Sequence, residues 1–468
     1  MASKAGWLLA ATAALLGGCS LAPDYQRPAL TAPAAYKESA PWQPAAATPA
    51  PAGKWWEAFG DPALNGLEGR IDAGNFDLAA ASARYEQAQA LVRQARADLF
   101  PQIDLAASGE RNRLSANRPL SKGLASTQTD KVVGGSLGYE LDLFGRVRNN
   151  IAAGRANAHA AAFDVEGVRL GLQSQLAATY FDLRGLDARI LLLRQTVESF
   201  QRAFDLTDTR HSGGIASGID VSRAQAQLSS AKSELSAVEI DRAKDEHAIA
   251  VLVGEAPATF SIPVADPQTR PPLIQPGLPS SLLERRPDIA AAERRVAAAN
   301  AQIGVARAAF FPNVTLGAQG GFESIGGDWL NAASSFWALG PLQAALTVFD
   351  GGRRAAQVRQ ARAQFEEAAA TYRQTVLDAF REVEDDLATQ RLLVAGEADQ
   401  AAAAKAAERT RDLALIRYRD GAADYLDVVT AQTAALDAER ALLQLRTRQL
   451  QAAGDTFRAL GGDFRAGK

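Results

Sequence analysis

The amino-acid sequence predicts a mainly helical α+β chain built from two copies of one half-molecule. Three observations predict it: an alanine-rich, charge-balanced composition, a long internal duplication, and four short segments in which apolar and polar residues alternate. Alanine-rich chains with balanced charge are typical of long packed helices. Alternation with a period of two is typical of strands that have one apolar face.

The composition excludes several classes of function. The 468 residues carry 50 Lys+Arg against 53 Asp+Glu, and a net charge of −3 offers no concentrated positive field for nucleic acid. One Cys and three His leave too few side chains for a metal cage, a disulfide framework or a Cys–His nucleophile. No Ser, Cys or His stands where a base would activate it, so we expect neither enzyme activity nor a cofactor.

Residues 1–18 have the order of a secretory signal. A short apolar run follows Lys4 and ends in small residues before the only cysteine, and this run is too short to span a bilayer. The string Leu16-Gly17-Gly18-Cys19 resembles a bacterial lipobox, in which Cys19 becomes the lipidated first residue. A plain cleaved signal with an incidental cysteine is the alternative. Residues 19–53 are rich in Pro and Ala, so we expect a lipid-anchored, extended segment.

The chain repeats itself at an offset near 209 residues, far too long for a solenoid. We expect the first repeat at 54–256 and the second at 282–463, joined by a Pro-rich linker at 257–281. The recurring residues include Phe100-Pro101 and Phe311-Pro312, Gly214 and Gly421, and Asp220 and Asp427.

For each repeat, the sequence predicts a helix, two strands, a very long helix, a tight turn and a second long helix. Residues 150–210 contain no Pro and little Gly, and as one helix they would extend about 90 Å. The second helix of that pair is expected at 219–253. Between Phe365 and Leu387 apolar residues step by sevens, fours and threes, as in a coiled coil. Because one globular core cannot support helices this long, we expect an extended bundle.

Strands are expected at about 102–113, 134–144, 313–323 and 341–349. Each alternates apolar and polar residues over nearly the ~9–11 residues that cross an outer membrane, and aromatic residues cluster near the ends. An ordinary amphipathic sheet packed on the helices is the alternative. Four strands cannot close a barrel, and open edges in lipid would leave backbone groups unsatisfied. Several chains would have to contribute strands, and their number stays open at this point.

Two segments resemble one protein family. Residues 54–64 read Lys-Trp-Trp-Glu-Ala-Phe-Gly-Asp-Pro-Ala-Leu, and residues 282–289 read Leu-Leu-Glu-Arg-Arg-Pro-Asp-Ile, with Phe310-Phe311-Pro312 following. Both resemble TolC-like outer-membrane efflux factors, and more specifically the lipoprotein branch with OprM- and NodT-type proteins. The likeness runs in the right order from Cys19 to about Gly461.

The resemblance implies a homotrimer with a TolC-like fold in the outer membrane of a Gram-negative bacterium, in contact with outer-membrane lipid. Four strands from each of three chains would form a twelve-stranded β-barrel, continued by a periplasmic α-helical barrel. Members are exit ducts of tripartite efflux systems that passively conduct small toxic compounds such as drugs. They dock to a periplasmic adaptor protein coupled to an inner-membrane transporter. Export of metal ions or of proteins is the alternative, and a lipid-anchored structural protein without a pore is less favoured.

The resemblance also places adaptor docking at the two helix-turn-helix tips. Small residues there allow a tight reversal and expose the backbone to a partner. A purely structural role in turns and helix caps is the alternative, because Ser217 and Asp424 stand where N-caps are expected. The candidate docking residues are Arg210, Gly213, Gly214, Ser217 and Asp220 in the first tip, and Arg417, Gly421 and Asp424 in the second.

The periplasmic aperture is expected at the second tip. In the OprM branch a leucine and an acidic residue four positions later ring the closed aperture. Leu426 matches the leucine, but Thr430 stands at the acidic position. Asp427 is near, although a shift of three positions turns its direction by about 60°. Tyr418 and Arg419 are candidates for contacts that hold the helices closed.

Overall fold

The computed structural model describes residues 20–38, 54–117, 126–265, 270–272, 279–325 and 330–462. The predicted signal at 1–18 and the predicted lipid attachment residue Cys19 lie outside these ranges, as do parts of the 19–53 segment and of the linker. The chain divides into two compact units. The first comprises Met1–Ala29, Arg84–Ala162 and Ala291–Arg373, and the second comprises Leu30–Ala83, Phe163–Ala290 and Gln374–Lys468.

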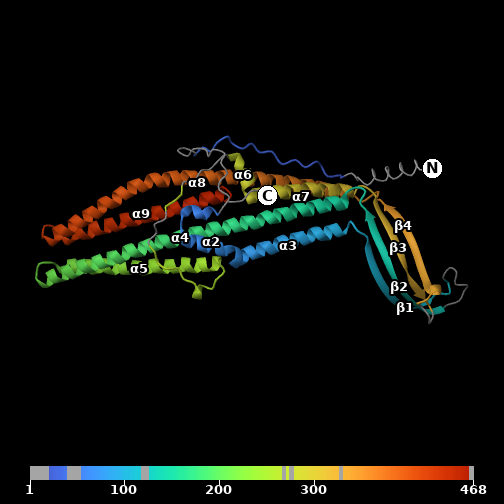
Figure 1. The fold of residues 1–468 in the computed structure, drawn as a ribbon, viewed down its shortest axis with the longest axis horizontal. Coiled ribbons are helices and arrows are strands. Elements are labelled where there is room, and N and C mark those ends of the chain that lie inside the picture. The colour runs from blue at the N-terminus through green and yellow to red at the C-terminus, as the bar shows by residue number, and fades with distance from the viewer. Residues whose placement is uncertain are drawn as a thin grey trace. The chain divides into compact units, whose positions relative to one another are not determined.

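The helices confirm the predicted order and the duplication (Figure 1). Both bounds of α8 and of α9 lie 207 residues after those of α4 and α5, so the two helical hairpins have equal lengths. The first half contains η1 Trp55–Phe59, α2 Pro62–Gly74, α3 Phe76–Ala97, α4 Arg146–Ser212, α5 Gly218–Leu252 and η2 Pro257–Thr259. The second contains η3 Pro279–Ser281, α6 Leu282–Arg285, α7 Pro287–Ala308, η4 Ala332–Ser334, α8 Arg353–Arg419 and α9 Tyr425–Ala459.

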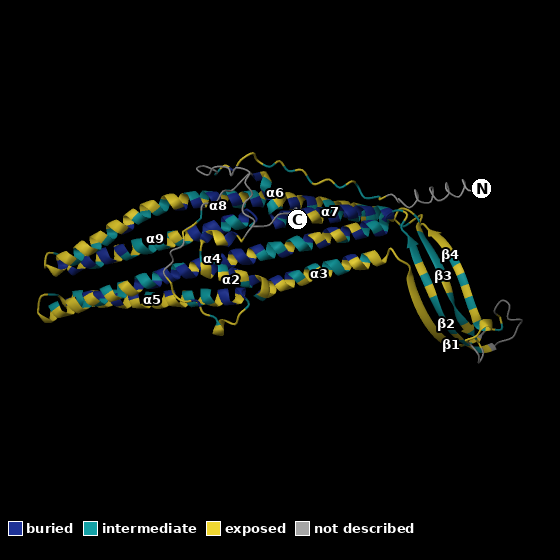
Figure 2. Cartoon of the chain, viewed as in Figure 1, coloured by how far each residue is buried: buried dark blue, intermediate teal, exposed yellow. Residues whose placement is uncertain are grey.

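The long helices bury an apolar stripe and expose the rest of their surface (Figure 2). On α8 the predicted coiled-coil positions from Tyr372 to Leu387 are at most 1% exposed, which confirms the seam there, whereas the first predicted position, Phe365, is half-buried. On α4 the buried residues include Leu176, Tyr180, Leu183 and Ile190. No helix within the described ranges combines the length and the hydropathy that a bilayer crossing requires.

The strands β1 (Gln102–Leu114), β2 (Ser126–Leu141), β3 (Asn313–Ser324) and β4 (Ser335–Ala345) form one antiparallel sheet in chain order. The register aligns Ile103, Leu137, Ala318 and Leu339 across the four strands, and the next row aligns Asp104, Ser136, Gln319 and Ala338. The predicted alternation therefore gives the sheet one apolar and one more polar face.

The predicted bounds of two strands are wrong. β2 begins at Ser126 rather than near 134, because its polar first half pairs with β1 and offers no apolar alternation to detect. β4 spans Ser335–Ala345 rather than 341–349. Two residues, Gly340 and Pro341, lie across from Gly317, and this β-bulge interrupts the period of two. Because of the bulge, Leu339 and Leu342, which flank it, lie on the same face of the sheet.

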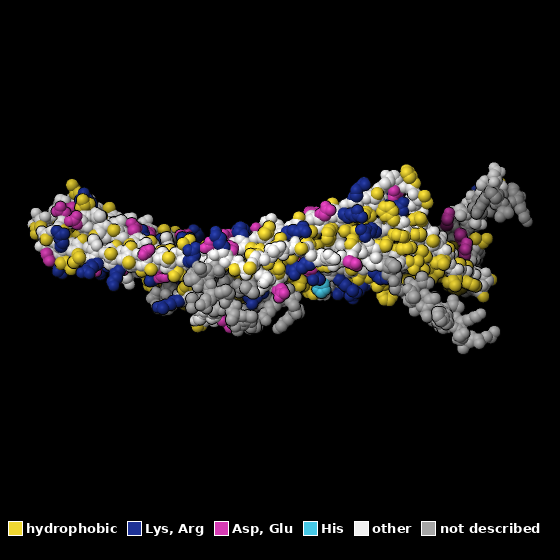
Figure 3. Space-filling view, turned by 90° about the horizontal axis from the view of Figure 1, so that it is seen from above, with side chains coloured by type: hydrophobic (Ala, Val, Ile, Leu, Met, Phe, Trp, Pro, Cys, Tyr) yellow, Lys and Arg dark blue, Asp and Glu magenta, His cyan; other side chains and the backbone are white. Residues whose placement is uncertain are grey.

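Among the described residues, none covers the apolar face of the sheet. Hydrophobic side chains gather over the sheet in the space-filling view (Figure 3). Leu105 is 86% exposed on β1, and Trp337 is 82% exposed on β4. Contiguous exposed apolar surface of this kind marks contact with a membrane or with another protein.

Candidate functional site at the hairpin tips

The first tip is a tight reversal between α4 and α5. The amide of Gly213 donates to Thr209 O at 3.1 Å, and the amide of Ile215 donates to Arg210 O at 2.8 Å. These bonds satisfy the last carbonyls of α4. Gly214 has φ +72°, the left-handed conformation that glycine adopts without steric cost, which explains the residue type at this position.

Ser217 and Asp220 start α5 as a capping box. The Ser217 Oγ accepts from the Asp220 amide at 3.2 Å, and the Asp220 carboxylate accepts from the Ser217 amide at 3.3 Å. The predicted N-cap position of Ser217 is confirmed. Ser217 remains exposed and lines a shallow surface hollow with Ile219 and Arg223, so its structural role does not hide it from a partner.

The second tip has the same backbone path with a different cap. Gly421 has φ +76°, and the amide of Ala422 donates to Arg417 O at 2.7 Å. The guanidinium of Arg417 donates to Ala422 O at 3.2 Å, so it closes its own turn. Asp424 occupies the N-cap position, as predicted, but its side chain makes no capping bond. Its exposed carboxylate is therefore available at the surface.

Arg210 joins the two tips. Its Nη1 donates to Tyr418 O at 2.7 Å, and its Cζ lies 4.7 Å from the centre of the Tyr418 ring. The Tyr418 hydroxyl lies 3.3 Å from Thr207 Oγ1 on α4. A charge-assisted hydrogen bond and a cation–π contact thus link the end of α4 to the end of α8.

Tyr418 belongs to a buried cluster between the hairpins. It is 7% exposed and packs with Ala224, Tyr425 and Val428, and its ring centre lies 5.3 Å from that of Tyr425. Burial, with the nearby Tyr418 and Asp220, raises the pKa of Tyr425 to about 12. Tyr425 therefore stays uncharged at physiological pH, and the cluster packs the two hairpins against each other.

The other aperture candidates lie at the surface. Leu426 is 50% exposed, Asp427 and Thr430 are exposed, and Thr430 Oγ1 donates to Leu426 O at 2.9 Å. Arg419 is exposed and pairs with Asp420 at 3.3 Å. Of the two residues expected to hold the helices closed, Tyr418 contacts Arg210, whereas Arg419 pairs with Asp420.

Sequence reasoning named Arg210 and Tyr418 separately and missed their contact. Their shared position in the last turns of two duplicated helices was the signal that could have paired them. Within the described ranges, no three His, Cys, Asp or Glu side chains are grouped as metal ligands would be. The site is thus a pair of joined helical tips with exposed small and charged residues.

The sequence matches the model of one protein family, "Outer membrane efflux protein", at residues 69–255 and 278–462. Among curated proteins, the outer membrane protein OprJ of Pseudomonas aeruginosa is 35% identical over 459 residues, 97% of this chain and 95% of that protein. The probable efflux pump outer membrane protein TtgC of Pseudomonas putida is 32% identical over 460 residues, with the same two coverages.

Solved structures share the fold. The outer-membrane channel OprN has a TM-score of 0.87 at 30% identity, covering 95% of this chain and 99% of that one. The CmeC outer membrane channel of Campylobacter jejuni has a TM-score of 0.89 at 26% identity, covering 96% of each chain. The chain therefore belongs to the outer membrane efflux protein family: it has the TolC-like channel fold with two repeats and is an outer-membrane efflux channel of Gram-negative bacteria rather than an enzyme.

Proposed function

We propose that three copies of this chain form the exit duct of a tripartite efflux pump and passively conduct small toxic compounds. Relatives with 32% identity are described as the antibiotic efflux pump protein ArpC and the toluene efflux pump protein TtgC, both of Pseudomonas putida. A cargo of antibiotics and organic solvents follows from that likeness. An exit duct needs a polar interior and a gate, and no reacting group.

The uncovered apolar face of the sheet carries this proposal. β1 and β4 are both edge strands, so one chain leaves two rows of unpaired backbone groups. In lipid those groups need partners, and closing the sheet is the only way to supply them. Three copies, each adding four strands, give a twelve-stranded barrel with its apolar face toward lipid.

We propose that Cys19 carries a lipid that anchors the chain. The residues that follow it are pinned to one unit: Ser20 Oγ donates to Asn149 Oδ1 at 2.8 Å, and Arg307 donates to Leu21 O at 3.1 Å. Asn149 lies at the start of α4, a few residues after β2 ends. This attachment supports an anchor held close to the strands, at the membrane surface.

The two tips are the proposed docking site for a periplasmic adaptor coupled to an inner-membrane transporter. Ser217 and Asp424 are exposed and equivalent in the two repeats, with Gly213, Gly214, Gly421 and Arg417 shaping the turns. The aperture is proposed at Leu426, with Asp427, Thr430 and Arg419 near it. Arg210 and Tyr418 would hold the hairpins in the closed arrangement.

Photo-crosslinking in cells tests the docking assignment. A photoreactive residue replaces Ser217 or Asp424, and the same replacement at exposed Ser236 on α5 serves as the control. We expect both tip positions to trap a periplasmic adaptor and the control to trap none. A trimer that is intact but traps no adaptor at either tip would contradict the assignment.

A further inference from the structure

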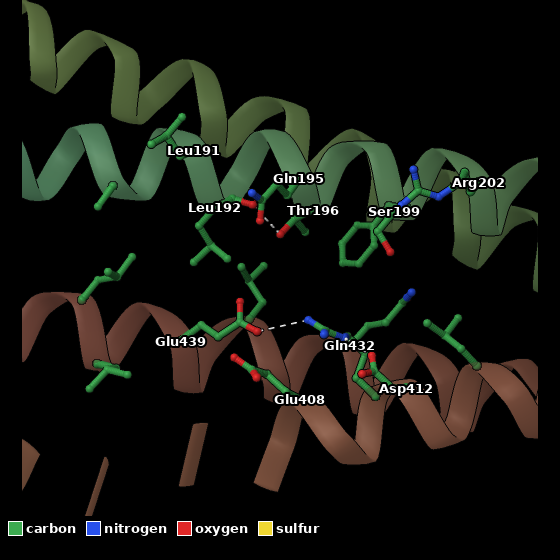
Figure 4. Close-up of a pocket in the computed structure, with 17 residues that line it drawn as sticks. Leu191, Leu192, Gln195, Thr196, Ser199, Arg202, Glu408, Asp412, Gln432 and Glu439 are labelled. Atoms are coloured by element: carbon green, nitrogen blue, oxygen red, sulfur yellow. Dashed lines mark hydrogen bonds and ion pairs between the residues drawn. The ribbon is translucent and has the colours of Figure 1, made fainter. Parts of the chain in front are cut away.

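A cavity of about 770 Å³ lies between α4 of the first hairpin and the α8–α9 pair of the second. Figure 4 shows Leu192 and Thr196 on α4 facing Glu408, Gln432 and Glu439 across the space. Its size is that of pockets that hold drug-sized molecules. Its wall combines leucines and one phenylalanine with about as many polar and charged side chains, so it suits an amphiphilic occupant.

Gln432 is a buried amide without a partner on this wall. It is 2% exposed, and neither its Oε1 nor its Nε2 has a hydrogen-bond partner among the described residues. Buried polar groups nearly always have a hydrogen-bond partner, and a buried group without one indicates a partner that is absent from the structure. An occupant with hydrogen-bonding groups would supply one.

The cavity wall carries three carboxylates, of Glu408, Asp412 and Glu439, against the guanidinium groups of Arg202 and Arg411, so one negative charge is left over. Arg411 is shared, because its Nε lies 3.0 Å from Asp412 Oδ1 and its Nη1 lies 3.1 Å from Glu439 Oε1. Glu408 lines the same cavity and makes no ion pair within the described part of the chain. Burial raises the pKa of Glu439, Arg411 opposes this, and the neighbouring carboxyl group of Glu408 raises the pKa further through its charge and a hydrogen bond. A positive charge beside Glu408 would reduce the repulsion between the carboxyl groups of Glu408 and Glu439.

The duplication shows that these features are particular to the second hairpin. Gln225, 207 residues before Gln432, is exposed and donates to Ser229 Oγ at 3.1 Å. The positions equivalent to Glu408 and Glu439 are Gln201 and Lys232, whose Nζ donates to Gln201 Oε1 at 3.4 Å. In the first hairpin the side chains at these positions thus form hydrogen bonds within the hairpin. In the second hairpin the same positions place two carboxyl groups and a buried amide without a hydrogen-bond partner on the wall of a cavity.

We propose that this cavity binds an amphiphilic organic monocation that carries N–H donors. Its apolar body would lie against the leucines of α4 and α9, its charge beside Glu408, and an N–H group on Gln432 Oε1. Arg411 is already paired with two carboxylates, and Arg202 is paired with Glu198, which disfavours an anion. Because the walls come from both hairpins, the occupant would also tie the hairpins together.

Equilibrium binding of proflavine tests the proposal. Proflavine is a fluorescent tricyclic monocation with two amino groups, and fluorescein is a tricyclic anion for comparison. The purified full chain is held in amphipol, and fluorescence polarisation is measured with each dye. We expect saturable proflavine binding, one per chain, that Glu408→Gln and Gln432→Leu each weaken about tenfold.

Matched variants separate this site from general effects. Glu239→Gln removes an exposed carboxylate of α5 whose ion-pair partner, Arg194, lies outside the cavity lining, and Gln225→Leu makes the equivalent amide change in the first hairpin, so both should bind as the wild type does. The melting temperature of each variant checks folding, and Glu408→Gln changes charge with almost no change of shape. Absent saturable binding, equal binding of fluorescein, or binding unchanged by both cavity variants would overturn the proposal.

Discussion

Glu68 is a glutamate buried on a helix, where glutamate side chains are usually exposed to solvent. It lies on α2 beside Leu64, Leu67 and Ile71, and it is 2% exposed. Neither of its carboxyl oxygens has a hydrogen-bond partner among the described residues. Burial, with a smaller contribution from Asp72, raises the pKa of Glu68 to about 9. The folded chain therefore holds this carboxyl group protonated at neutral pH.

The stability of the fold should fall with rising pH because of this residue. In the unfolded chain the carboxyl group ionises near its ordinary pKa of 4.5, whereas in the folded chain it ionises near 9. Its contribution is therefore fully present below pH 4.5 and is lost as the pH rises toward 9. Relative to Glu68→Gln, the wild type should lose on the order of 1 kcal/mol per pH unit between these values.

Heat-unfolding midpoints at several pH values between 5 and 9 measure this difference. The same substitution at exposed Glu57 should leave the pH dependence of the wild type unchanged. Parallel curves for the wild type and Glu68→Gln would show that this carboxyl group is not held neutral.

At the scale of elements, the two hairpins are equal in length, but equivalent arginines at their tips make different contacts. Arg210 and Arg417 are equivalent in the repeats. Arg210 reaches the other hairpin at Tyr418, whereas Arg417 bonds Ala422 in its own turn. Only the first of the two arginines therefore couples one hairpin to the other.

Removing that coupling should separate the hairpins. Arg210→Ala deletes a charge-assisted hydrogen bond and a cation–π contact, together about 2 kcal/mol. We expect faster amide hydrogen exchange in the last turns of α4 and α8, and a higher open fraction of the channel in bilayers. Arg417→Ala serves as the matched control and should loosen only its own turn. Equal effects of the two substitutions would contradict a coupling role for Arg210.

The elements were largely predictable, because their signals are local. The lack of Pro and the duplication predicted α4 and α8, and the seam from Tyr372 to Leu387 predicted their packing face. The start of β2 was missed because strand pairing, not apolar alternation, defines it. The bond between Arg210 and Tyr418 and the burial of Gln432 depend on how two distant hairpins meet, and no local pattern encodes that.

At the scale of the whole molecule, one chain is incomplete by itself. Its sheet has two open edges and an exposed apolar face that includes Leu105, Trp337 and Leu339. Water does not favour such a surface, and lipid accepts it only when the backbone edges are paired. The proposed arrangement of three copies around a central axis would resolve both problems, and it would leave the polar residues of the sheet facing the interior.

Conductance of the purified protein in planar lipid bilayers would show whether this chain forms a gated exit duct. We expect a detergent-resistant trimer that inserts and gives discrete current steps, rarely open in the wild type and more often open in Arg210→Ala. A folded trimer that never carries current, in the wild type or in that variant, would contradict the central claim that this chain forms a gated exit duct.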